Sequence, residues 1–421
     1  MSKWVQTVKP TSKPWHFTRL WSRLGLLMLG ALSALLLVQL VDYAYEDEVE
    51  FVSYFTAAEV LRDGGGAAVL YDDPAFNEEI DIRGYTGRQV YYPNPPSTAF
   101  FVMPLTVFTI QVARIIWLAM SVSFLSIAVI LLLRDLGYGT TASLCFVLLT
   151  LVYQPIRADL HNGQLYALGL LLLVLTLRAL RRQQPAYTGA SCAGLLMLKL
   201  FSPLVCLWLA VERDWRALKF AFVVLVLFVF LSWPIIQQDG WVAFTQVPFK
   251  VANDRALSVT AFQSIPGMIR HLLSYDPIWN PVPILRLEYG INAIIWTAGI
   301  AMTLVTLWAT RKSQNIDLSF ALVISASIML SPFSQDYTYT LLLLPIGVIS
   351  VRLWPLPWSP LLIFALLATG LVASPIWYKT PIYSKGALAL LAYPKLYGCL
   401  VIWSILLFLI IRPGGSTSTA Q

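Results

Sequence analysis

Glu50 is the first residue in the chain whose type and setting indicate chemistry. It ends the acidic stretch EDEVE at 46–50 and precedes residues 51–61, where aromatic and apolar side chains recur with helical spacing until the glycines at 64–66. A carboxylate at the apolar edge of such a helix would have a raised pKa and could act as a general base. The alternative is that these acids only stabilise the helix N-terminus, where negative charge is favoured.

A second polar stretch, RADLHNGQ at 157–164, stands at the start of an apolar run. It holds a cation, an imidazole and two amides in Arg157, His161, Asn162 and Gln164. At a membrane boundary these groups suit a phosphate or a sugar. An ion pair between Arg157 and Asp159, combined with helix capping, is the alternative.

Lys199 interrupts the apolar run LMLKLFSPL, and Pro203 breaks the helix four residues later. An ionisable side chain inside a membrane segment is costly and by default suggests function. A broken helix also frees backbone groups that must line a cavity. Lys199 is therefore a candidate partner for a phosphate, with snorkelling to the membrane surface as the alternative.

Further candidates lie in three other polar segments. SPFSQDY at 331–337 places Gln335, Asp336 and Tyr337 at the mouth of two apolar helices, either to bind a ligand or to cap a turn. YYPNPPS at 91–97 is stiff because of its prolines, and forms either a rigid turn or the wall of an acceptor cleft. Arg255 is a less specific cation.

Composition decides the class of protein that must position these residues. The 421 residues are 58% hydrophobic and 12% charged, and mean hydropathy is +0.70. Runs of about 20 apolar residues recur, as in a polytopic helical membrane protein. The net charge of +7 comes from cations scattered at the ends of these runs, so no nucleic-acid surface is expected. The four cysteines lie in apolar runs without metal spacing, and no nucleotide or metalloprotease motif occurs.

The apolar runs predict an all-α, single-domain bundle over 1–421 with about twelve membrane spans. The expected spans are 22–43, 111–133, 140–155, 164–180, 186–199, 201–212, 217–234, 290–310, 318–332, 337–352, 356–374 and 387–411. The stretch 97–109 is too short to span and is expected to lie at the membrane surface, as is the helix after Glu50. Two long loops result, at 44–110 and 235–289.

Basic residues fix the expected orientation. Lys3, Lys9 and Lys13 precede the first span, and with twelve spans every later basic cluster at a helix end falls on the same side. Both chain ends are therefore expected in the cytoplasm. The candidate residues gather on the opposite, extracytoplasmic face.

Taken in order, these motifs resemble a known family, the GT-C fold glycosyltransferases that use polyprenyl-phosphate sugars, specifically glycosyltransferase family 87 or DUF2029. The resemblance rests on the following elements: Glu50-Phe51, Tyr54-Phe55, Ala57-Ala58, Gly64–Gly66, Leu70-Tyr71-Asp72, Tyr92–Pro96, Gly163-Gln164, Lys199 with Pro203, and Ser331-Pro332. Two positions depart from the family pattern. Glu50 stands where the family usually has aspartate, and Tyr337 stands where a histidine is often found.

The resemblance implies an inverting transfer on the outer face of a bacterial inner membrane. The donor would be a polyprenyl-phosphate sugar, with mannose favoured over arabinofuranose, and the acceptor a glycolipid or polysaccharide. Glu50 would be the catalytic base. The cations Lys199, Arg157, His161 and Arg255 would bind the donor phosphate, and the sugar or acceptor would contact Tyr54, Asn162, Gln164, Gln335, Asp336 and Tyr337. No cofactor and no obligatory metal is expected, since cationic side chains are present.

A transporter or a lipid or glycolipid flippase is the main alternative. It would need ionisable residues near the middle of the membrane and paired broken helices in two related halves. The sequence has one broken element, at 199–203, and its polar residues gather at one membrane face. The pattern therefore favours an enzyme that works at the membrane surface.

Overall fold

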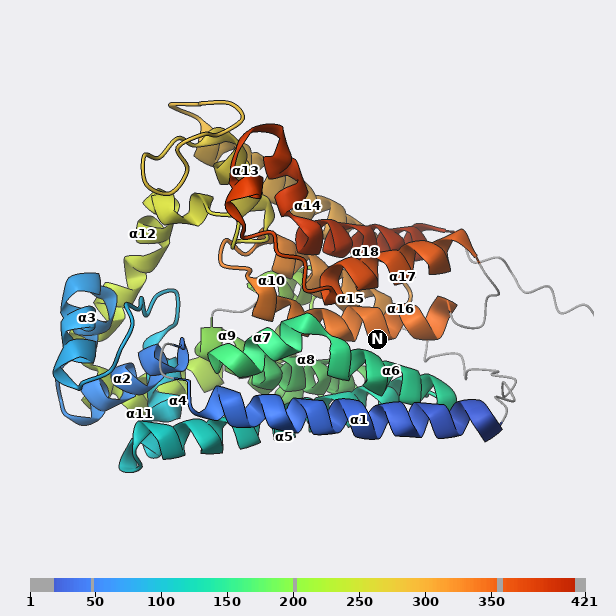
Figure 1. Cartoon of the computed structure of the whole chain (residues 1–421), viewed down its shortest axis with the longest axis horizontal. Coiled ribbons are helices and arrows are strands. Elements are labelled where there is room, and N and C mark those ends of the chain that lie inside the picture. The colour runs from blue at the N-terminus through green and yellow to red at the C-terminus, as the bar shows by residue number, and fades with distance from the viewer. Residues whose placement is uncertain (1–18, 47–48, 200–202, 354–358, 413–421) are drawn as a thin grey trace, which may run out of the picture.

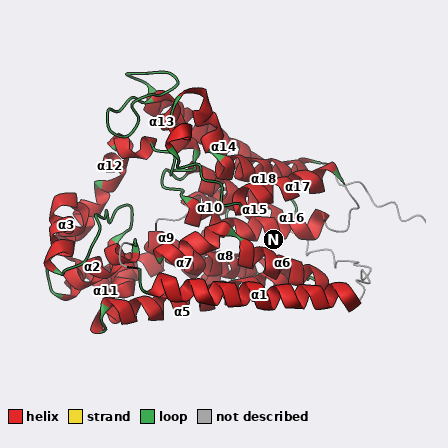
Figure 2. Cartoon of the chain, in the orientation of Figure 1, coloured by secondary structure: helices red, strands yellow, loops and turns green. Residues whose placement is uncertain are grey.

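The computed structural model describes residues 19–46, 49–199, 203–353 and 359–412, and within these ranges the chain is helical with no strand. Figures 1 and 2 show the arrangement. The N-terminal lysines used above, and Asp47 and Glu48 of the acidic stretch, lie outside the described residues.

Most of the chain folds into α-helices joined by short connections. They are α1 (Arg19–Ala44), α2 (Phe51–Arg62), α3 (Asp73–Ile82), α4 (Pro96–Val102), α5 (Ile110–Leu136), α6 (Thr140–Val152), α7 (Gln154–Asn162), α8 (Tyr166–Arg181), α9 (Pro185–Lys199), α10 (Pro203–Val211), α11 (Trp215–Thr245), α12 (Val247–Asn253), α13 (Ile265–Leu273), α14 (Ile291–Lys312), α15 (Ile316–Leu330), α16 (Leu343–Leu353), α17 (Pro360–Ala373) and α18 (Pro394–Ile411). Short 3-10 helices include η1 (Ala67–Tyr71), η2 (Met103–Val107), η3 (Arg255–Ser258), η4 (Asp336–Leu342), η5 (Pro381–Ser384) and η6 (Gly386–Ala392).

The long helices form a bundle, and the smaller ones gather at one of its ends. In Figure 1, α1, α5, α6 and α8 run side by side along the longest axis, with α15 to α18 packed above them. The helices α2, α3 and α4 of the first long loop lie at the same end as α12. Two loops that are far apart in sequence are thereby brought to one end of the molecule.

Membrane spans are confirmed, but twelve of them are not. By length and composition, six helical segments in the described residues could cross a membrane: Leu24–Ala44, Ile110–Leu136, Trp215–Asn253, Ile291–Lys312, Asp336–Leu353 and Pro394–Ile411. A seventh is added if α6 and α7, bent by 49° at their junction, count as one span. The helices found at the other expected positions have 16 residues or fewer, among them α8, α9 and α10. The count of twelve stays a prediction.

The helix α2 is enclosed by protein on nearly every side, whereas the sequence suggested a membrane-surface helix with one exposed face. Ten of its twelve residues are buried. It packs against α3, α4 and η2, and Ala57 and Ala58 are fully buried. Small side chains at these positions let the neighbouring backbones come close. The helix after Glu50 therefore belongs to the protein interior.

Helix α11 continues past Pro234, where the sequence predicted its end. The backbone departs from helical angles at Gln237 (φ 58°, ψ 176°), and the helix then resumes to Thr245. The segment is thus two helical stretches joined at a kink just after the proline, which removes a helix hydrogen bond. Here Gly240 lies so close to η1 that a Cβ atom on it would overlap Ala67. The expected loop at 235–289 therefore begins within a helix.

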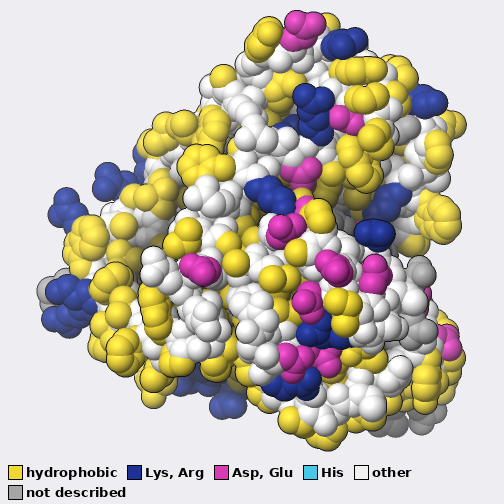
Figure 3. Space-filling view, turned by 90° about the vertical axis from the view of Figure 1, so that its left-hand side faces the viewer, with side chains coloured by type: hydrophobic (Ala, Val, Ile, Leu, Met, Phe, Trp, Pro, Cys, Tyr) yellow, Lys and Arg dark blue, Asp and Glu magenta, His cyan; other side chains and the backbone are white. Residues whose placement is uncertain are grey.

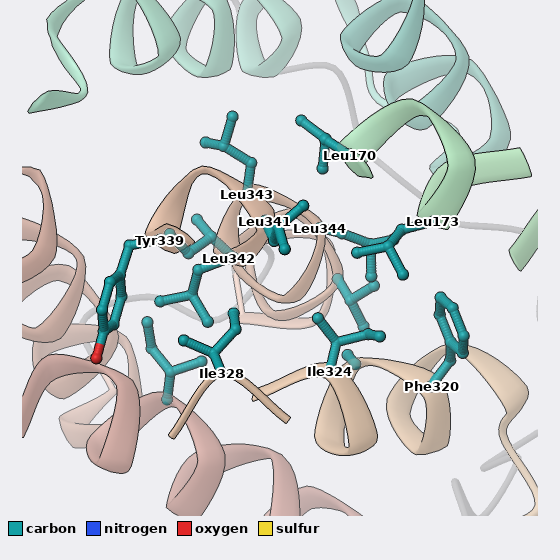
Figure 4. Close-up of a cluster of buried hydrophobic side chains, with 14 of the residues drawn as sticks. Leu170, Leu173, Phe320, Ile324, Ile328, Tyr339, Leu341, Leu342, Leu343 and Leu344 are labelled. Carbon is teal, nitrogen blue, oxygen red and sulfur yellow. The ribbon is translucent and has the colours of Figure 1, made fainter. Parts of the chain in front are cut away.

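A dense apolar core lies between α8, α15 and η4. Figure 4 shows Leu170, Leu173, Phe320, Ile324 and Ile328 beside the side chains of Tyr339 and Leu341–Leu344. All of these residues are essentially buried. Between membrane helices such a core stabilises through van der Waals packing, because lipid tails are as apolar as leucine. The core therefore anchors η4, the element on which Tyr337 stands.

Candidate active site

The Glu50 carboxylate is held by partners from two distant parts of the chain. Glu50 is the N-cap residue of α2, but its side chain makes no capping hydrogen bond. The Tyr337 hydroxyl donates to Oε1 at 3.1 Å and to Oε2 at 3.0 Å. The Gln164 side-chain amide also donates to Oε2. The carboxylate is therefore turned toward η4 and the α7–α8 turn, and helix capping does not explain it.

Lys199 joins the same cluster from the end of α9. Its Nζ donates to the Tyr54 hydroxyl at 3.1 Å and to Oε1 of Gln164 at 2.5 Å. It also lies 4.9 Å from the ring centre of Tyr166 and 5.4 Å from that of Tyr337, distances typical of cation–π contacts. The Gln164 amide thus contacts Glu50 through its nitrogen and Lys199 through its oxygen.

A tight turn between α7 and α8 positions Gln164. Gly163 has φ +65°, and a Cβ atom there would overlap Arg114 Nη1 and lie 2.8 Å from Phe51 Cβ. Asp159 accepts hydrogen bonds from the backbone N–H groups of Tyr166 at 3.1 Å and Ala167 at 2.9 Å. These contacts cap α8. Asp159 therefore holds the turn, in place of the pair with Arg157 considered from the sequence.

The surroundings of Glu50 favour its neutral form. Burial raises the pKa of Glu50, while the charge of Lys199, the Tyr337 hydrogen bond and the charge of Lys379 oppose that rise. The net shift is upward, as expected of a carboxylate moved out of water. Burial and the nearby Glu50 also raise the pKa of Tyr54 well above its ordinary value, so this phenol stays a neutral donor. The site can hold a carboxylate poised to take a proton.

Comparison with known families decides what kind of protein carries this cluster. The family model of glycosyltransferase family 87 matches residues 92–332, which is more than half of the chain. This chain belongs to glycosyltransferase family 87. No curated protein and no solved structure matches it. The matched segment contains Gln164 and Lys199, while Glu50, Tyr54 and Tyr337 lie outside it.

In this family 87 chain, Asp336 and Gln335 face other partners than Glu50. Asp336 accepts a hydrogen bond from Tyr378, and its carboxylate lies 3.4 Å from Lys379 Nζ and 3.7 Å from Lys395 Nζ. Gln335 forms a capping box at the start of η4. Both residues therefore fix the start of η4, the element that carries Tyr337.

Three further candidates lie on α7, and each contacts groups close to that helix. His161 Nε2 lies 2.7 Å from Glu46 Oε2, and its ring packs edge-on against Tyr43 at 5.0 Å. The Arg157 guanidinium donates to the Leu151 carbonyl at 3.4 Å, and Asn162 donates to the carbonyl of Ala158 in its own helix at 2.8 Å. Glu46 is thus the acidic partner in this group. Arg255 lies in a different cavity, 3.7 Å from Asp276.

Arg114 is a residue of this glycosyltransferase that the sequence reading missed. It is 3% exposed, and its guanidinium donates to the carbonyls of Leu160 and His161 while lying 5.5 Å from the ring centre of Phe51. It therefore ties α5 to the end of α7 and to the start of α2. A lone cation in an apolar run could have revealed it, by the argument that singled out Lys199.

No group of three histidine, cysteine, aspartate or glutamate side chains in the described part of the family 87 chain is close enough to hold a metal ion. Asp47 and Glu48, beside Glu50, lie outside that part. The expectation that no metal is required stays a prediction.

Proposed function

We propose that this family 87 protein transfers a sugar, with mannose the favoured one, from a polyprenyl phosphate to a glycolipid or polysaccharide on the extracytoplasmic side of a bacterial inner membrane. One observation carries the proposal: a carboxylate, Glu50, and an ammonium group, Lys199, are joined through the single amide of Gln164. Such a pair can remove a proton at one point and neutralise a leaving anion at another.

The proposed reaction is a single displacement. The acceptor hydroxyl oxygen attacks the anomeric carbon while its proton passes to Glu50. The bond between the anomeric carbon and the phosphate oxygen breaks, and the polyprenyl phosphate leaves with the electron pair. Lys199 stabilises the negative charge that develops there. Attack opposite the leaving group inverts the anomeric centre.

A lipid-linked donor is favoured by the surroundings of Lys199. The residue ends α9, an apolar helix, and Leu165, Leu195, Leu198 and Leu341 surround a void of about 10 Å³ beside it. An apolar chain attached to a phosphate would place its head at Lys199, and these leucines would move apart to admit its tail, because the void holds about one water molecule. A soluble nucleotide has no apolar tail to pack against these leucines.

The donor class is tested with the full chain in liposomes and labelled mannose on either polyprenyl phosphate or a nucleoside diphosphate. Transfer is expected only from the lipid-linked donor. Lys199→Met should raise the donor KM about ten- to a hundredfold, since a hydrogen bond to a charged group contributes about 1.5–3 kcal/mol. The acceptor KM should stay close to that of the unmodified chain. Transfer from the nucleotide donor alone, or equal effects on both KM values, contradicts the proposal.

A further inference from the structure

A second polar site lies where the first long loop meets the segment after α11. It is an open cavity of about 620 Å³ lined by residues of α3, α12 and η3 and by Tyr92. Figure 3 views the end of the molecule that carries α3 and α12, and acidic and basic side chains are interspersed over its middle. The cavity shares no lining residue with the Glu50 cluster.

The charges inside this cavity are paired. Lys250 Nζ lies 2.8 Å from Asp73 Oδ1 and 4.2 Å from the ring centre of Tyr92. The Tyr92 hydroxyl donates to Asp254 Oδ2 at 3.1 Å. Arg255 lies 3.7 Å from Asp276. Two cations and two carboxylates therefore line the cavity, and most of them already have an opposite partner.

This chemistry fits a neutral, polyhydroxylated ligand. Phe249, 69% exposed, offers a flat apolar face at the rim, and the amides of Gln246 and Asn253 line the same cavity beside the carboxylates. Sugars present apolar C–H faces to aromatic rings and hydroxyls to carboxylates and amides. A free anion would meet two carboxylates, and a lipid tail would cover ionised groups at a high cost.

The cavity is also tied to the Glu50 cluster by the chain itself. The Tyr92 ring lies 6.3 Å from that of Phe333, four residues before Tyr337. A few residues after Tyr92, Ser97 and Thr98 donate to the carbonyls of Met197 and Leu198, next to Lys199. One short segment therefore connects the cavity with both sides of the cluster.

We propose that the cavity formed by Tyr92, Phe249, Lys250 and Asp254 binds the glycan portion of the acceptor, with Phe249 as the stacking surface. The assignment of this ligand as the acceptor rests on the proposed function. The binding of a neutral glycan is a property of the cavity alone. Phe249 would set acceptor affinity without touching the reacting atoms.

The test measures binding of soluble probes to the full chain in nanodiscs by saturation-transfer NMR. The probes are methyl α-D-mannopyranoside, methyl α-D-arabinofuranoside and methyl β-D-glucopyranoside. At least one should bind, and Phe249→Ala should weaken it about tenfold, the scale of a lost aromatic contact. Phe249→Trp should retain binding. Phe222→Ala is the matched control, because Phe222 is 67% exposed on α11 and does not line the cavity.

Three results would overturn this inference: no probe binds, Phe249→Ala binds as well as the unmodified chain, or inorganic phosphate displaces the glycoside. Glu50→Gln, tested in the same way, should bind the probe normally. If transfer from polyprenyl phosphate fails while binding still depends on Phe249, the proposed reaction is wrong and the glycan site stands. If transfer proceeds and Phe249→Ala changes neither binding nor acceptor KM, the glycan site is wrong and the proposed reaction stands.

Discussion

Gln164 links Glu50 to Lys199, because its side-chain amide is hydrogen-bonded to both. A direct ion pair would neutralise both groups and leave neither available. The amide keeps them apart while it bonds to each, donating to the carboxylate and accepting from the ammonium. Glu50 can thus accept a proton, and Lys199 can face a phosphate, in one connected network.

The pH dependence of transfer should report the raised pKa of Glu50. The carboxylate works as a base only when it is ionised, so the rate should rise as the pH rises through that pKa. Tyr337 stabilises the ionised form, and its removal should raise the pKa further. In Tyr337→Phe, the acidic limb of kcat/KM should therefore move upward by about one pH unit.

Tyr339→Phe is the control for this prediction. Tyr339 stands on the same element, η4, but its hydroxyl donates to the carbonyl of Gln263. Loss of that hydroxyl should leave the acidic limb where it is. An unmoved limb in Tyr337→Phe would mean that the titrating group is not Glu50.

Sequence reasoning at this scale named the central residues but not all of their partners. Glu50, Gln164 and Tyr337 stood out as polar residues at the edge of an apolar run, and Lys199 stood out because it interrupts one. The structure places the four together. Arg255 was grouped with them by charge alone, although the fold puts it in another cavity. Charge can be read from a sequence, but the direction of a side chain depends on tertiary packing.

At the scale of elements, the α7–α8 turn decides where Gln164 lies. The turn needs a left-handed residue without a side chain, because Arg114 and Phe51 fill the space around Gly163. The same contacts connect the turn to α5 and α2. A change at Gly163 would therefore move Gln164, Arg114 and the start of α2 together.

Gly163→Ala should destabilise the protein by about 1–3 kcal/mol through overpacking, in addition to backbone strain. It should also lower the transfer rate at saturating substrate. The measurements are thermal unfolding in detergent and the transfer assay. Gly84→Ala is the matched control, because Gly84 has φ +72° with nothing within 4 Å of its Cβ position. Equal losses in both variants would show that strain alone is responsible and that the turn does not position Gln164.

Local sequence patterns predicted which elements exist better than how they are surrounded. The helix after Glu50 was expected from its spacing, but its enclosure by α3, α4 and η2 depends on segments that follow it in the chain as far as Val107. Pro234 signalled a helix end, and the backbone does leave helical angles at Gln237, but a second helical stretch then runs to Thr245 and packs against η1. In both cases tertiary packing adds what the local signal does not contain.

At the scale of the whole molecule, the two ends of the bundle have different polar chemistry. The end with α2, α3 and α4 holds the Glu50 cluster. At the C-terminal end of α8, Arg178 pairs with Asp135 at 2.9 Å and Arg181 pairs with Asp317 at 2.6 Å. Basic residues favour the cytoplasmic side. The expected orientation therefore places α3 outside and the end of α8 inside.

Cysteine labelling tests this orientation in a variant without the four native cysteines. Glu78→Cys on α3 and Arg182→Cys after α8 are both at exposed positions. A membrane-impermeant maleimide added to intact spheroplasts should label Glu78→Cys only, and permeabilised cells should give both. Labelling of Arg182→Cys alone in intact cells would reverse the orientation and place the Glu50 cluster in the cytoplasm.

The central claim is that Glu50 takes the acceptor proton, and single-turnover transfer by Glu50→Gln from a polyprenyl-phosphate sugar tests it most directly. The amide keeps the size of the side chain but cannot accept the proton, so the variant should fold and bind donor normally. Its transfer rate should fall by about 10²–10⁴-fold, the usual contribution of a general base. A folded Glu50→Gln protein that turns over at close to the normal rate would contradict the account.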